Sequence, residues 1–595
     1  MRSSYLLLTA LPLSTASSYT CPPLGPVLPN HPNPRAHPAV RAALATFAAS
    51  LEAETAAFHA SAVSVAVKSA LEDEPLLEFH HTPRARDPRG AGRVDENTVY
   101  RLASVSKVFA VLAALMRDDV VRWDDPVTKY IPELRGPVEG GVVVGVDVVD
   151  WEDVTVEGVA AHVAGIGADM MTDRSQYDGN WESLGLPPIP DDEKTPACGG
   201  FLGAPPCTRE EFLDVYKNRR PPVYPSYHTP VYSNTGTTLV ALVVEAATGK
   251  PFDRLLRELI LDPVGMSSTY YPSPPEDLSK LFIPENCTIF DWNLGVFNPA
   301  GAMYSSTRDM LKFGDAILRH RLLSPARTRR WLKPSTFTSG PDAFVGQPWE
   351  GYLSDNLTAD GRVVEVYTKG GDIDEYKAGL VLVPEHNVTI TILAAGGEAA
   401  GRRFSYYAET MNAVLPPLIR ALDEAARDDA REKIVGVFED GESGSRIGLG
   451  LDGGPGVRVE DWVMRGFEVV PNWRRYSHAG LNDTGMRPDR ERTARVYPTG
   501  LLRDGGRAAG WRAVIDVLGE GEREGIDGEM FWRRASCITW LTMDRVSYNN
   551  VGLDYFEFGY GEDGRVERVY AKGFGVEMRR VEVEGGEDSF GSQEL

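Results

Sequence analysis

The sequence predicts a mixed α/β body followed by a smaller all-β module. Two observations predict the body: helical patterns stand near its beginning and its end, and β-branched runs of strand length lie between them. Helices at both ends with strands between them indicate a sheet that is sandwiched by helices. A third observation predicts the module, because beyond residue 434 the pattern changes to short alternating runs with Gly and Asp turns.

The body begins with a helix and a hairpin. Residues 38–58 carry Ala and Leu at helical spacing, and the runs SAVSVAVKSA and PLLEFHH that follow have strand composition. From about Ser104 to Arg117 the chain is apolar nearly all round, which predicts a buried helix. Residues 150–230 are loop-rich, with many Pro, Gly and Asp, and such a stretch can form the walls of a cleft.

The body ends with a helix, three strands and a last helix. The helical pattern from about Asn234 to Thr248 stops at Gly249, a residue suited to a left-handed cap. Strand patterns return at VVEVYTKGG, YKAGLVLVPE and NVTITILAAG. A final helical pattern then closes the body near Lys433.

These patterns divide the chain into three segments. The first residues place Arg2 before a short apolar run and then small residues, which is the layout of a signal peptide and predicts a secreted protein. A disordered or partly buried N-terminus is the alternative. We assign residues 1–18 to the signal peptide, 19–433 to the body and 434–595 to the β-rich module, a small barrel or sandwich in which Cys537–Met543 is one expected strand.

Composition narrows the classes of function. Apolar residues make up 42% and charged residues 25% of the chain, as in soluble globular proteins. The 62 basic and 85 acidic residues give a net charge of −23, which repels nucleic acid and anionic lipid. We therefore expect a small-molecule substrate and neither nucleic acid nor a membrane as partner, and we leave the oligomeric state open.

The five cysteines all follow the expected cleavage point, where an oxidising compartment permits disulfides. Cys198 and Cys207 flank the loop GGFLGAPP and are the first choice for a bridge, with buried free thiols as the alternative. Four Asn-x-Thr sequons are compatible with glycosylation on a eukaryotic secretory route. They begin at Asn286, Asn356, Asn387 and Asn482.

The sharpest chemical signal is the pair Ser104 and Lys107. Residues three apart at a helix start lie on one face, so an amine stands beside a hydroxyl. Burial lowers the pKa of a lysine, which allows it to take the proton of a serine nucleophile. Alone, the S-x-x-K pattern is weak, because a chain of this length contains about one or two by chance.

A second motif, Val-Tyr232-Ser-Asn234-Thr-Gly, stands directly before an apolar helix. The Tyr232 phenol can share a proton with Ser104 and Lys107. The Asn234 amide can donate to a substrate carbonyl and contact Lys107. The alternative is an ordinary helix cap at Asn234, with Tyr232 filling core space.

The third motif, Lys369-Gly370-Gly371-Asp372, stands at the end of a strand. The glycines let a substrate backbone approach the strand edge, and Lys369 supplies positive charge for an anionic substrate or transition state. The alternative is a simple glycine turn after an edge strand. No histidine or carboxylate pattern at metal-ligand spacing accompanies the motifs, so we expect no metal.

In the order S-x-x-K, Y-x-N and K-x-G, these motifs resemble the serine β-lactamase and penicillin-binding-protein superfamily, nearest to its class C and esterase-like branch. The resemblance covers roughly residues 35–430 and extends to RVDENTVYRLASVSKVF and GAMYSSTRDMLKF. With its β-rich tail the whole chain looks like fungal secreted β-lactamase-like proteins. The resemblance implies an antiparallel sheet sandwiched by helices, an all-α lobe, and an acyl-enzyme that needs no cofactor.

The resemblance also implies a role for each motif. Ser104 forms the acyl-enzyme, Lys107 and Tyr232 act as the coupled base and acid, and Asn234 orients the substrate. The backbone N–H groups of Ser104 and Asp372 form the oxyanion hole.

One position departs from the family pattern. Where the third motif usually has Ser or Thr, this chain has Gly370, and the missing hydroxyl commonly helps to hold a substrate carboxylate. We therefore expect a serine hydrolase that acts on an ester or amide ahead of a lactam. An acyltransferase on the same scaffold and a non-catalytic binding protein are the alternatives.

Overall fold

The computed structural model describes residues 21–581 apart from 137, 140–141, 144, 192, 197, 199–204, 477–485 and 519. The expected signal peptide and the sequon at Asn482 therefore lie outside the described residues. Contacts divide the described chain into a larger unit, Pro32–Ser354 with Val364–Ala421, and a smaller unit, 21–31 with Asp355–Val363 and 422–581.

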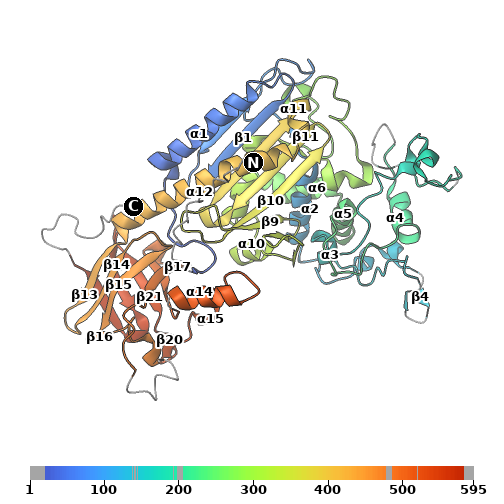
Figure 1. The fold of residues 1–595 in the computed structure, drawn as a ribbon. Helices are drawn as coiled ribbons and strands as arrows, with labels where there is room; N and C mark the ends of the chain where they lie inside the picture. The colour runs from blue at the N-terminus through green and yellow to red at the C-terminus, as the bar shows by residue number, and fades with distance from the viewer. Residues whose placement is uncertain are drawn as a thin grey trace, which may run out of the picture. The chain divides into compact units, whose positions relative to one another are not determined.

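The larger unit is built on an antiparallel sheet (Figure 1). Among the described residues, eight strands follow one another in the order β2-β1-β12-β11-β10-β9-β8-β7. Strands β1, β11 and β12 are buried along their whole length, because helices cover both faces of the sheet. The strands are β1 Ala62–Ser69, β2 Leu77–His81, β7 Thr336–Phe337, β8 Ala343–Val345, β9 Glu350–Ser354, β10 Val364–Ile373, β11 Tyr376–Val383 and β12 Val388–Ala395.

Helices cover the two faces of this sheet as the sequence predicts. Helices α1 (Pro38–Thr55) and α12 (Tyr406–Lys433) lie across one face (Figure 1). On the other face, helix α9 (Thr307–Leu318) packs against β1 and β12, and the turn before helix α2 (Ser106–Leu115) packs against β10. The sandwich of an antiparallel sheet between helices is therefore confirmed.

A helical lobe packs around the apolar helix α2. It contains α5 (Asn234–Thr248), whose bounds match the predicted helix and which ends at Gly249 with a φ of 68°. The prediction that residues 150–230 are rich in loops is confirmed for the described part of this segment, which also contains two helices, α3 (Val156–Ala160) and α4 (Arg209–Asn218). Their apolar side chains join those of α5 in one buried cluster. Long-range packing therefore stabilises two helices that the surrounding Pro and Gly residues make hard to predict from local sequence.

The smaller unit contains a β-barrel. In its described part, nine strands run in the order β14-β13-β23-β22-β21-β18-β17-β15-β16, and the further pairing of β14 with β15 closes the sheet. This closure decides between the barrel and the sandwich that the sequence left open. The strands are β13 Gly436–Asp440, β14 Ser445–Gly450, β15 Val457–Met464, β16 Phe467–Glu468, β17 Ala494–Arg503, β18 Ala508–Ile515, β21 Tyr555–Tyr560, β22 Val566–Ala571 and β23 Val576–Arg580.

One expected strand of the module is wrong. The run Cys537–Met543 contains the short helix α15 (Thr539–Thr542) and pairs with no barrel strand. A disulfide joins Cys537 to Cys21, and the Thr539 hydroxyl donates to the Cys21 carbonyl, so the segment is tied to the N-terminal residues. In the part of the chain that the structure describes, no helix is both long and apolar enough to cross a bilayer.

Candidate active site

The predicted nucleophile lies in a tight turn between a short strand and helix α2. Ser104 occupies a 3₁₀ turn, Ala103–Val105, and the preceding Ala103 has a left-handed φ of 46°. The Ser106 hydroxyl donates to the Ala103 carbonyl (2.6 Å) and accepts from the Met303 N–H (3.0 Å). Ser106 therefore holds the turn that presents Ser104, a role that the sequence motif did not reveal.

Lys107 stands beside Ser104 as the motif predicts. Its Nζ donates to Ser104 Oγ (2.9 Å) and to the Ala300 carbonyl (2.8 Å), and the residue is fully buried. Burial lowers the pKa of Lys107; the nearby Tyr232 opposes this effect and the charge of Lys369 adds to it, and the net shift is downward. The environment therefore favours the neutral amine that a base requires.

Tyr232 brings the second motif to the same place. The ammonium groups of Lys107 and Lys369 each lie 5.0 Å from the centre of its ring, and His162 packs against the ring at 4.7 Å. Burial raises the pKa of the Tyr232 phenol, but the charges of Lys107 and Lys369 outweigh it, so the net pKa is lowered. Ser104 also contacts the phenol. Residues from all three motifs thus meet in one cluster.

Asn234 lies at the site but makes a different contact from the one expected. Its Nδ2 donates to the Asp169 carboxylate (3.2 Å), whereas the second acceptor of Lys107 is a backbone carbonyl. The helix cap is Ser233, whose hydroxyl accepts from the Gly236 N–H (2.9 Å). Asn234 is therefore free of the capping role, and Asp169 adds a carboxylate that the motif did not indicate.

Lys369 of the third motif is paired with a carboxylate. Its Nζ lies 2.5 Å from Glu350 Oε1, and Glu350 Oε2 accepts the Gly370 N–H (3.0 Å). Burial lowers the pKa of Lys369, but Tyr232 and Glu350 together raise it above its ordinary value, so Lys369 keeps its charge. The sequence reasoning missed Glu350, because its position follows from the pairing of β9 with β10.

Gly371 lets strand β10 lie against the nucleophile turn. A Cβ at this position would overlap the Leu102 carbonyl and lie 3.2 Å from the Ser104 nitrogen. The pairing of β10 with β9 ends at Thr368, and the Gly370 N–H points to the edge of β10 that β9 leaves open. In an antiparallel strand, the N–H groups of residues i and i+2 point to the same side. The Asp372 N–H therefore faces the same edge. The Asp372 carboxylate itself pairs with Lys377 (2.6 Å).

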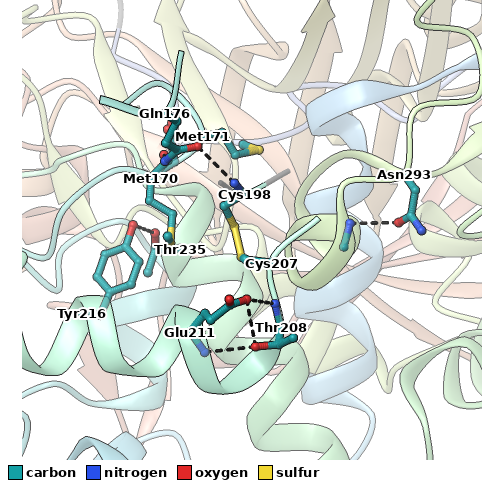
Figure 2. The surroundings of a disulfide bond; sticks show 12 residues. Met170, Met171, Gln176, Cys198, Cys207, Thr208, Glu211, Tyr216, Thr235 and Asn293 are labelled. Atoms are coloured by element: carbon teal, nitrogen blue, oxygen red, sulfur yellow. Dashed lines mark hydrogen bonds between the residues drawn. A yellow bond between two sulfur atoms is a disulfide. The ribbon is translucent and has the colours of Figure 1, made fainter. Parts of the chain in front are cut away.

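A disulfide supports the segment that precedes the second motif (Figure 2). The predicted bridge Cys198–Cys207 is present, and the Cys198 N–H donates to Gln176 Oε1 (3.0 Å). Directly after it, Thr208 caps helix α4, which places Tyr216 in hydrogen-bonding contact with Thr235. The bridge is thus linked through one helix to the residue that follows Asn234.

Removing this bridge is expected to destabilise the larger unit. In the double variant Cys198→Ser/Cys207→Ser the unfolded chain gains loop entropy, which costs about 2–3 kcal/mol of stability. We expect a lower melting temperature in calorimetry and a smaller effect of reductant than in the wild type. Cys287→Ala, which removes a buried free thiol and keeps both bridges, is the control. An unchanged melting temperature in the double variant would contradict the structural role.

The fold and the site together define a β-lactamase-like protein: an antiparallel sheet between helices, a helical lobe, and a Ser-Lys-Tyr cluster at the sheet edge. The sequence model of the family described as Beta-lactamase matches residues 71–414, and the chain belongs to this family. A second model, described as Beta-lactamase-like-like, C-terminal domain, matches residues 426–582.

The chain is also similar to individual proteins from other organisms and to solved structures. A Beta-lactamase-like protein of Arthroderma benhamiae is 28% identical over 524 residues, which cover 83% of each chain. The Probable hydrolase M10 of Phoma sp. is 26% identical over 430 residues, 70% of this chain and 68% of that one. A solved class C beta-lactamase is 16% identical, with a TM-score of 0.45 over 64% of this chain and 95% of that one. One of these similar proteins is thus named as a probable hydrolase.

Proposed function

We propose that the protein is a secreted serine hydrolase that cleaves an ester, amide or lactam through an acyl-enzyme on Ser104. One observation carries the proposal: the 2.9 Å hydrogen bond between the buried Lys107 Nζ and Ser104 Oγ, made beside the ring of Tyr232. A buried amine with a lowered pKa beside a hydroxyl is the arrangement that activates a serine nucleophile.

In the proposed acylation step, Ser104 Oγ attacks the substrate carbonyl carbon and its proton passes to the Lys107–Tyr232 pair. The backbone N–H groups of Ser104 and Asp372 donate hydrogen bonds to the carbonyl oxygen as it becomes negatively charged, each contributing about 3 kcal/mol. The bond to the leaving group then breaks, and the pair returns the proton to that group. Water attacks the acyl-enzyme by the same route and releases the acid and free Ser104.

Labelling with a fluorophosphonate, followed by mass spectrometry, tests this proposal. The wild type is expected to carry one label on the Ser104 peptide, and Ser104→Ala none. Absence of label in the wild type would favour the non-catalytic binding protein. Transfer of the acyl group to an added alcohol or amine, faster than to water, would identify an acyltransferase instead.

Secretion and glycosylation belong to the same proposal. The disulfides Cys198–Cys207 and Cys21–Cys537 suit an oxidising compartment. Of the predicted glycosylation sites, Asn286 and Asn356 are exposed and Asn387 is half-buried. Recovery of the protein from culture medium, N-terminal sequencing and deglycosylation with mass detection test these assignments. A product that starts at Met1 and stays inside the cell would contradict them.

We also expect acylation to fall as the pH is lowered. The pKa values of Lys107 and Tyr232 are both lowered, and the reaction uses the deprotonated base of this pair. The rate is therefore retained above the pKa of the base and lost as the pH falls through it. In a profile of kcat/KM against pH, the fall in rate on the acid side is expected to have its midpoint below about pH 10, which is near the ordinary pKa of a tyrosine or lysine side chain. A midpoint at or above that pH would contradict the assignment of the base.

A further inference from the structure

The side chain of Tyr407, in the first turn of α12, fills the space beside Gly370. A Cβ built on Gly370 would overlap the Tyr407 hydroxyl. Gly379, which pairs with Gly370 across β10 and β11, would place a Cβ 2.8 Å from Tyr407 Cβ. The ring therefore lies across both glycines, with its hydroxyl at Gly370. A side chain at position 370 would compete with this ring for the same space, which the Tyr407 hydroxyl occupies instead.

The Tyr407 hydroxyl is an uncharged group that is available for hydrogen bonding. Burial raises the pKa of Tyr407, and the neighbouring Glu350, Tyr352, Tyr232 and Asp372 raise it further, so the phenol stays protonated near neutral pH. Within the described part of the chain, no side chain or backbone group is hydrogen-bonded to this hydroxyl. The residue is half-buried, so the hydroxyl can donate to and accept from a bound molecule.

In the two ion pairs at the edge of β10, the carboxylate is more exposed than the ammonium group. The Lys369 side chain is 1% exposed and its partner Glu350 is 32% exposed. The same order holds for the next pair, because Lys377 is 9% exposed and Asp372 is 57% exposed. An approaching molecule therefore meets carboxylate oxygens, while the ammonium groups lie behind them. A substrate carboxylate would be repelled, and Lys369 has no unpaired charge to offer it.

We propose that Tyr407, Glu350 and Gly370 form a subsite that binds an uncharged polar group of the substrate and excludes a carboxylate. The substrate class is thus a neutral ester or amide. The inference rests on the proposed function, because it concerns the substrate group next to the bond that is cleaved when Ser104 attacks. Tyr407 supplies the hydrogen bond to the substrate, and Gly370 provides the space for the Tyr407 ring. The negative charge of Glu350 repels a substrate carboxylate.

The first test compares two pairs of aryl esters. Within each pair the esters differ only in a carboxylate or a carboxamide, placed on the acyl group in one pair and on the leaving group in the other. In at least one pair, kcat/KM for the carboxamide is expected to exceed that for the carboxylate by about tenfold or more. The ratio should shrink as salt is added, because screening weakens the repulsion between exposed charges. A ratio near or below one in both pairs would overturn the inference.

Glu350→Gln tests the source of the discrimination. Glutamine can keep a hydrogen bond to the Gly370 N–H but leaves the Lys369 charge unpaired, so the carboxylate ester should gain about tenfold relative to the carboxamide. The matched control is Glu365→Gln in the neighbouring strand β10, where the carboxylate pairs with Lys333 and the ratio should not change. The ratio of two kcat/KM values does not depend on the folded fraction. An unchanged ratio in Glu350→Gln would therefore count against the proposal.

The hydroxyl is tested by Tyr407→Phe and by a double-mutant cycle. Tyr407→Phe should lower kcat/KM for the carboxamide by about three- to tenfold and leave the carboxylate ester nearly unaffected. Gly370→Ser alone should reduce activity because of the overlap with Tyr407, and Gly370→Ser/Tyr407→Ala should recover part of it. Equal losses on both esters in Tyr407→Phe, or no recovery in the double variant, would contradict the assigned geometry.

Fluorophosphonate labelling of every variant separates the two proposals, because the probe carries no carboxylate. If Ser104 is labelled but the carboxylate esters are preferred, the subsite inference is wrong and the acyl-enzyme remains. If Ser104 is never labelled, the proposed function is wrong, and the subsite inference is overturned with it.

Discussion

Lys107→Ala is expected to lower the rate of Ser104 acylation by about 10²–10⁴-fold, the contribution typical of a positioned general base. The variant removes the only ammonium or amine that the structure places in hydrogen-bonding distance of Ser104 Oγ among the described residues. Tyr232→Phe should cost a comparable factor, on the order of 10² or more, because the two groups share one proton-transfer step. The measurement is the second-order rate of fluorophosphonate labelling, together with kcat/KM on a neutral ester.

A control separates loss of the base from loss of the fold. Lys129→Ala removes an exposed lysine of the same unit, paired with Asp125 at 2.7 Å, and should leave both rates unchanged. Each variant is compared by melting temperature, since burial of Lys107 means that its removal also changes packing. If Lys107→Ala retained full activity on a substrate that Ser104→Ala cannot cleave, the assignment of the base would be wrong.

Gly371→Ala is expected to lower kcat/KM by about 10²–10³-fold, the effect of losing one oxyanion-hole donor. The added methyl group would overlap the Leu102 carbonyl, so strand β10 must move away from the nucleophile turn. That movement separates the Ser104 N–H from the Asp372 N–H. In the proposed mechanism, both N–H groups must donate to the same substrate oxygen. Substrate affinity should change less than kcat, because the interaction is made mainly in the transition state.

Gly397→Ala is the matched control for this variant. It lies in the same unit, and a Cβ built there meets no heavy atom within 4 Å. Both variants lose the same backbone freedom in the unfolded chain, so a difference between them reports on the contact with the nucleophile turn. Gly371→Ala with wild-type turnover would show that the approach of β10 to Ser104 is not needed for the reaction.

Much of the larger unit is predictable from local pattern. The bounds of α5, the central strands and the helices that cover the sheet agree with the apolar periodicity, because each element buries the face that its sequence makes apolar. The strand prediction for Cys537–Met543 was wrong because its alternation suits a strand, whereas longer-range contacts hold it in a helical turn. These contacts are the disulfide from Cys537 to Cys21 and the hydrogen bond from the Thr539 hydroxyl to the Cys21 carbonyl. Local propensity is weak and yields to such constraints.

The sequence by itself determined the motif residues Ser104, Lys107 and Tyr232 and their order along the chain, because each motif lies at an element boundary that local pattern marks. Only the tertiary structure decided which side chains surround them. Glu350 reaches Lys369 through strand pairing, and Tyr407 reaches Gly370 through the packing of α12 on the sheet. Contacts between residues so far apart in the chain depend on register and packing, and no local pattern encodes them.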